Sequence, residues 1–140
     1  MRDQEAAIIG LLVFLFIIVI WYVVNVFYLL TLTKALKQVD ESRRGITPGM
    51  VWLNLIPLFN LGWHIYTVIQ MSDALAKECD IRGISYENKP GYVIGLVASI
   101  LMATSIIPYL GGLLWIGGVV CGIIYWVQIS EFSRKIAQPV

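Results

Sequence analysis

Charge is scarce in this chain of 140 residues. Asp, Glu, Lys and Arg together make up 14% of the sequence, against roughly 25% in a typical soluble domain. The acidic and basic residues avoid the centres of the long apolar runs, where ion-coupled transporters and proton relays place such groups. The net charge is +1 and no large basic patch occurs, so nucleic acid is not an expected partner.

Residues that build catalytic centres are also few. The sequence has one histidine and two cysteines, Cys79 in a polar stretch and Cys121 in an apolar one, so no disulfide framework is indicated. No HExxH, CxxC, GxSxG or phosphate-loop motif occurs, and one histidine cannot build a multi-histidine metal site. We therefore expect neither an enzyme nor a metal centre.

Apolar residues dominate instead, at 59% of the chain with a mean hydropathy of +0.79. At 1.5 Å per residue, four apolar runs approach or exceed the roughly 30 Å of a bilayer core, the third of them barely. Because backbone groups must be paired in lipid, such spans should be helical. We predict an all-α integral membrane four-helix bundle, formed as one domain over residues 1–140, with spans at about 6–33, 50–70, 92–107 and 110–129.

A short motif occurs twice. Gln70–Lys77 and Gln128–Lys135 both read Gln, apolar, Ser, acidic and, four residues later, Lys, and both end an apolar run that begins near a proline, Pro48 or Pro108. This pattern predicts two tandem helical hairpins related by a parallel internal repeat. The alternative is that two unrelated helices leave the membrane through similar residues, each with a helix-stabilising i, i+4 pair.

The distribution of basic residues gives an expected orientation. With four spans, the side that holds both termini carries six basic residues and the opposite side carries four. The larger number favours cytoplasmic termini, although the four lie within eleven residues, which favours the reverse.

Polar residues of the second span form a candidate site. Asn60, His64 and Thr67 follow i, i+4, i+7 spacing on one helical face, Asn54 precedes them, and Pro57 should kink the helix there. This stripe either lines a cavity or makes hydrogen bonds between helices. His64 could serve as an axial ligand to a haem or chlorophyll-type pigment, or could bond a neighbouring helix.

Small residues recur every four positions in the last two spans and should let helices approach closely. They would pack inside the hairpin or against another protein. These positions are Gly91, Gly95, Ser99 and Ala103, followed by Gly118 and Gly122.

Two stretches resemble an uncharacterised family of bacterial four-helix membrane proteins with the signature Pro-Gly-x-Val-Trp-Leu-x-x-Ile-Pro-x-Phe. The resemblance covers most of the chain after residue 40. It implies a bacterial cytoplasmic membrane location, and the soluble domains of some relatives imply cytoplasmic termini. The matching residues are Pro48, Gly49, Val51, Trp52, Leu53, Ile56, Pro57 and Phe59, and then Tyr125, Trp126 and Val127.

These features predict a non-enzymatic interaction or accessory subunit of the membrane. Its partners would be the lipid bilayer and either copies of itself or other membrane proteins. One alternative is a small homo-oligomeric channel or transporter lined by the polar stripe. Another is a haem- or chlorophyll-binding helper that uses His64.

Overall fold

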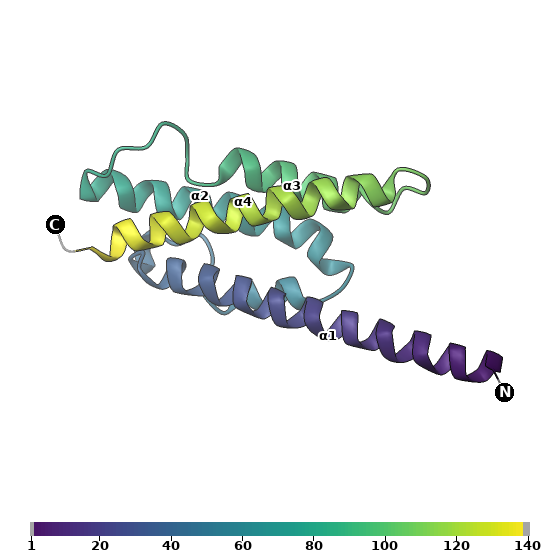
Figure 1. Ribbon diagram of the computed structural model, residues 1–140. Helices are drawn as coiled ribbons and strands as arrows, with labels where there is room; N and C mark the ends of the chain where they lie inside the picture. The colour runs from purple at the N-terminus through teal and green to yellow at the C-terminus, as the bar shows by residue number, and fades with distance from the viewer. Residues whose placement is uncertain (1, 139–140) are drawn as a thin grey trace.

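The computed structural model describes residues 2–138, which form helices joined by turns and loops (Figure 1). No strand occurs in this range, so the predicted all-α class with four helices is confirmed. Two short 3₁₀ segments, η1 (Glu41–Arg43) and η2 (Met50–Leu55), lie between the first two helices. The four helices are α1 (Arg2–Lys37), α2 (Phe59–Arg82), α3 (Tyr92–Thr104) and α4 (Gly111–Ala137).

The helices do not alternate in direction. In Figure 1, α1, α2 and α4 run the same way, and only α3 runs against them. The α3–α4 hairpin is present as predicted, but the prediction that α1 and α2 form a hairpin is wrong. After α1, residues 38–58 run back along the bundle through η2 before α2 begins. The hairpin that precedes α3 is therefore formed by η2 and α2.

The second apolar segment is broken rather than continuous. After η2 the backbone is extended at Ile56, and Leu58 adopts a left-handed φ of +65° before α2 begins at Phe59. Pro57 has no N–H to donate into a helix, and an extended residue before proline is the usual conformation. The predicted kink at Pro57 is therefore a complete break, and the expected helix over 50–70 is wrong in its first half.

Arg44 holds the turn that follows α1. Its Nε donates to the carbonyl of Val39 at 2.7 Å, and its Nη2 donates to the carbonyl of Lys37 at 2.9 Å. Carbonyls at the end of a helix lack partners within the helix, and a cation there also opposes the negative end of the helix dipole. Arg44 thus ends α1 and directs the chain back along the bundle.

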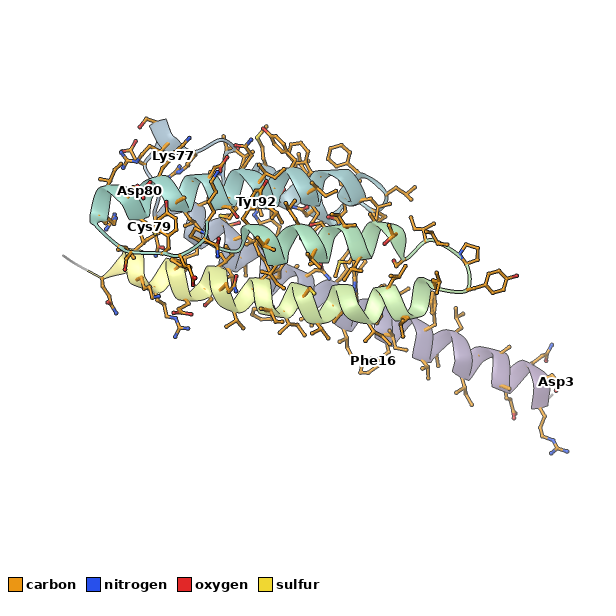
Figure 2. All side chains as sticks on the ribbon, turned by 90° about the horizontal axis from the view of Figure 1, so that it is seen from above. Asp3, Phe16, Lys77, Cys79, Asp80 and Tyr92 are labelled. Carbon is orange, nitrogen blue, oxygen red and sulfur yellow. The ribbon has the colours of Figure 1, made fainter. Side chains whose placement is uncertain are left out.

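The first two thirds of α1 diverge from the rest of the bundle, and the first turns of this helix extend past the α3–α4 turn (Figure 1). Side chains from Ile8 to Val24 are almost all exposed, and Phe16, labelled in Figure 2, is 66% exposed. Burial begins only at Leu29, where α1 joins a core that includes Leu75 and Tyr125. Two helices, α1 and α4, are long and apolar enough to cross a membrane, whereas α3 is apolar but has only 13 residues.

Charged side chains gather at one end of the bundle, and Figure 2 shows Lys77 and Asp80 there with Asp3 at the opposite end of α1. Of the ten Lys and Arg residues, only Arg2 lies away from this charged end. The start of α1 and the end of α4 lie at opposite ends of the molecule (Figure 1), which gives no support to the expectation that both termini lie on one side of a membrane. The nine basic residues at the charged end are Lys34, Lys37, Arg43, Arg44, Lys77, Arg82, Lys89, Arg134 and Lys135.

Candidate functional site

A chain of hydrogen bonds through His64 connects α1, α2 and α3. The hydroxyl of Tyr28 lies 3.0 Å from Nε2 of His64, and Nδ1 of His64 lies 2.6 Å from Oγ of Ser99. The Ser99 hydroxyl lies 2.7 Å from the carbonyl oxygen of Gly95, one turn earlier on α3. Three helices are therefore joined by one histidine side chain in the middle of the bundle.

The partners fix the direction of this chain. The carbonyl of Gly95 can only accept, so the Ser99 hydroxyl donates to it, and Ser99 Oγ accepts from His64. Nδ1 of His64 then carries a proton, and in the neutral ring Nε2 accepts from the hydroxyl of Tyr28. This arrangement requires one neutral tautomer and satisfies both ring nitrogens.

Asn54 and Thr67 make a second, separate polar contact. Nδ2 of Asn54 donates to Oγ1 of Thr67 at 3.1 Å and to the carbonyl of Val51 at 2.8 Å, and Thr67 donates to the carbonyl of Trp63. These bonds fasten η2 to α2. The four residues of the predicted stripe therefore do not line one cavity: two hold η2 in place, His64 faces α1 and α3, and Asn60 has a buried Oδ1 without a partner in residues 2–138.

The predicted small residues lie where a large side chain from another helix packs. A Cβ added to Gly95 would come within 2.6 Å of Val68 and 2.8 Å of the Tyr125 ring, and one added to Gly91 would also meet Tyr125. On α4, a Cβ at Gly118 would meet Met102, and one at Gly122 would lie 3.6 Å from the same methionine. Ser99 is 2% exposed and bonds His64, and Ala103 is half-buried. These positions serve contacts within the chain.

The geometry at His64 does not favour a pigment. A metal would need a free ring nitrogen, and both nitrogens already have partners. Residues 2–138 contain no group of three His, Cys, Asp or Glu side chains that could hold a metal ion.

Sequence reasoning missed the role of Tyr28 and its aromatic neighbours. The Tyr28 ring packs against Trp126 and Tyr125 of α4, with ring centroids 5.8 and 6.3 Å away. Nε1 of Trp126 donates to Oγ1 of Thr31 at 2.9 Å. Because Tyr28 and Thr31 are three apart on α1, this face could have been found by its helical spacing, but its partners on α2 and α4 could not.

A second missed feature is an ion-pair network at the charged end. Glu78, whose side chain is 4% exposed, accepts from Arg43 at 2.9 Å and from Arg82 at 2.8 Å. Nη1 of Arg82 donates in addition to the carbonyl of Ile136 at the end of α4. Burial by itself raises the pKa of Glu78, but the hydrogen bonds and positive charges of the two arginines outweigh it, so the pKa of Glu78 lies below its usual range. Only the i, i+4 spacing of Glu78 and Arg82 was visible in the sequence.

The chain has no match among models of known protein families, among curated proteins or among solved structures. The resemblance drawn from the Pro48–Phe59 signature therefore stays a prediction.

Proposed function

We propose that this protein is an integral membrane subunit without catalytic activity, which binds other membrane proteins or further copies of itself through α1. The observation that carries the proposal is the projecting part of α1. Its side chains from Ile8 to Val24 are apolar on every side and almost all exposed. A helix that is apolar all round belongs in a lipid or protein environment rather than in water.

The charge distribution supports a membrane orientation. Nine of ten basic residues lie at one end, and the apolar length of α1 lies between them and Arg2. Basic residues near spans accumulate on the cytoplasmic side. We infer that the charged end faces the cytoplasm and that the start of α1 lies on the other side of the membrane.

One face of α1 is best suited to a partner. Phe16, Ile20 and Val23 follow helical spacing on the side opposite to the buried Leu29 and Leu36. This face points away from the bundle, so a second helix could pack there without disturbing the rest of the chain. Without a hydrophobic drive between helices in lipid, the affinity would come from close packing.

The geometry gives less support to the channel alternative. A channel lined by the stripe would need Asn54, His64 and Thr67 to face an open space between subunits. Each of them instead bonds another group of the same chain.

Native mass spectrometry of the protein, extracted gently from its own membrane, tests the proposal. Extra mass from other polypeptides, or a multiple of 15.7 kDa, is expected for an interaction subunit. A triple variant that replaces Phe16, Ile20 and Val23 by Ala should lose that extra mass and remain folded. The matched control replaces Val93, Ile100 and Val120, which are exposed on α3 and α4, and should keep it. A bare 15.7 kDa species in the native protein would overturn the proposal.

A further inference from the structure

The two hairpins of this chain turn in the same way. Ile56-Pro57-Leu58 joins η2 to α2, and Ile107-Pro108-Tyr109 lies in the turn between α3 and α4. Leu58 and Tyr109, with φ values of +65° and +74°, are the two non-glycine residues with positive φ in residues 2–138. Both turns therefore place a bulky, exposed side chain in a conformation that such residues rarely adopt.

The two turns lie at different depths. Both second arms end in the same exit motif, at Gln70 in α2 and at Gln128 in α4. At 1.5 Å per residue, Leu58 lies about 18 Å from the level of Gln70, whereas Tyr109 lies about 29 Å from the level of Gln128. A bilayer core is roughly 30 Å thick. The α4 arm of the second hairpin is long enough to cross it, whereas the first hairpin reaches little beyond its middle.

Contacts with α1 give the same depth for the first turn. Tyr28 bonds His64, so these residues lie at one level of the bundle. Leu58 lies six residues before His64 on the way to one end of the bundle. Lys34, the first basic residue of α1 after Arg2, lies six residues after Tyr28 on the way to the other end. The turn at Leu58 therefore lies about 18 Å from the charged end of α1.

The first turn is suited to a surrounding of lipid tails. Ile56, Leu58 and Phe59 are exposed, Leu58 to 81%, and no charged residue occurs from 45 to 72. The carbonyls of residues 56, 57 and 58 accept from the N–H groups of Asn60, Phe59 and Leu61. Pro57 has no N–H, so little of the turn's hydrogen-bonding capacity is left unmet in hydrocarbon.

We infer that the chain crosses the bilayer three times, with α1, with α3 together with the residues that follow it up to Tyr109, and with α4, and that residues 47–70 form a half-depth hairpin. This hairpin would enter and leave at the charged side, and its apolar turn would contact acyl chains near the bilayer midplane. The inference rests on the membrane location proposed above. An odd number of crossings agrees with the positions of the start of α1 and the end of α4 at opposite ends of the molecule.

Cysteine labelling in membrane vesicles tests the depth. In a background with Cys79 and Cys121 replaced by Ala, single cysteines are placed at Glu41, Leu58 and Tyr109, all of which are exposed. A membrane-impermeant maleimide is applied to right-side-out and to inside-out vesicles. Glu41→Cys should react only in inside-out vesicles, Tyr109→Cys only in right-side-out vesicles, and Leu58→Cys in neither until detergent is added.

A second probe of the first turn, Ile56→Cys, guards against a local effect at Leu58 and should also be protected. Reaction of Leu58→Cys and Ile56→Cys from the side of Tyr109 would mean that both arms of the hairpin cross the bilayer, which gives five crossings, and reaction from the side of Glu41 would mean a water-filled cleft. Either result overturns the half-depth hairpin while the membrane location stands. Release of the protein by alkaline carbonate, with Glu41→Cys and Tyr109→Cys reacting in both vesicle types, would instead contradict the membrane location.

Discussion

Nη2 of Arg43 lies 2.9 Å from Oε2 of Glu78, 35 residues further along the chain. The other carboxylate oxygen of Glu78 accepts from Arg82, and Arg82 in turn donates to the carbonyl of Ile136. One buried carboxylate therefore connects the segment after α1 with the ends of α2 and α4. The same contact holds the first part of the segment 38–58 at the charged end, where the half-depth hairpin begins.

Replacing Glu78 with Gln should destabilise the protein. The substitution removes the charge that pairs with both arginines and leaves two guanidinium groups, each about one third exposed, without their partner. We expect a loss of about 2 kcal/mol, because the arginines keep part of their hydration. Thermal unfolding in detergent measures it.

The control for this substitution is Glu131→Gln. Glu131 pairs with Lys135 at 2.9 Å, but both side chains are about half exposed. An exposed i, i+4 pair contributes about 0.3–0.5 kcal/mol. The unfolding temperature of this variant should therefore lie close to that of the native protein. Equal losses in the two variants would contradict the role given to Glu78.

Stability should fall in acid because of the same carboxylate. The pKa of Glu78 is lower in the folded chain than its ordinary value of 4.5, so the folded state favours the ionised form. The contribution of Glu78 is fully present above pH 4.5 and is lost as the pH falls through the folded-state pKa. The unfolding temperature should decline more steeply below pH 4.5 in the native protein than in Glu78→Gln, and parallel declines would argue against this linkage.

Two glycines offer a matched test of helix packing. Gly95→Ala should destabilise the protein, because the new Cβ would meet Val68 at 2.6 Å and Tyr125 at 2.8 Å. Gly62→Ala should be neutral or stabilising by up to about 1 kcal/mol, since nothing lies within 4 Å of a Cβ there and Ala is the better helix former. Gly95→Leu should prevent folding. If both alanine variants unfold at the same temperature, the close approach at Gly95 does not matter for stability.

The sequence predicted the helices better than their arrangement. The lengths of the apolar runs predicted where α1, α3 and α4 begin and end to within a few residues, except at the end of α4, which continues to Ala137. Long uncharged runs have few other conformations available. The apolar run at 50–70 was misread as one helix because hydropathy does not register a change of direction. The extended residue before Pro57 and the left-handed φ of Leu58 break this run. A leucine gives no indication in the sequence that its φ will be positive.

The candidate site shows the same limit. The i, i+4, i+7 spacing correctly placed Asn60, His64 and Thr67 on one helix, but spacing alone does not reveal the partners. Ser99 was selected as a small packing residue, yet its hydroxyl bonds His64, and Tyr28 was not selected at all. Contacts between residues 35 or more positions apart depend on how helices pack: the parallel packing of α1 and α2 brings Tyr28 to His64, and the antiparallel packing of α2 and α3 brings Ser99 to it.

The hydrogen-bond chain through His64 makes a spectroscopic prediction. His64 is the single histidine, so protein labelled with ¹⁵N-histidine gives one pair of ring signals. We expect a protonated Nδ1 and an unprotonated Nε2, because Ser99 donates to Gly95 and must accept from His64. The opposite tautomer, or a rapidly averaging pair, would contradict the direction derived for this chain.

Substitutions at one end and at the centre of this hydrogen-bond chain, at Tyr28 and His64, should separate its role in stability from any role in binding a pigment. Tyr28→Phe removes the donor to Nε2 and should cost about 0.6 to 1.7 kcal/mol, the range for hydrogen bonds between helices in membranes. Tyr22→Phe is the control, since Tyr22 is exposed on the projecting part of α1. His64→Ala should reduce stability modestly and leave the visible absorbance of the purified protein unchanged. Loss of a visible absorption band in His64→Ala, with Tyr28→Phe as stable as Tyr22→Phe, would instead assign His64 to a pigment.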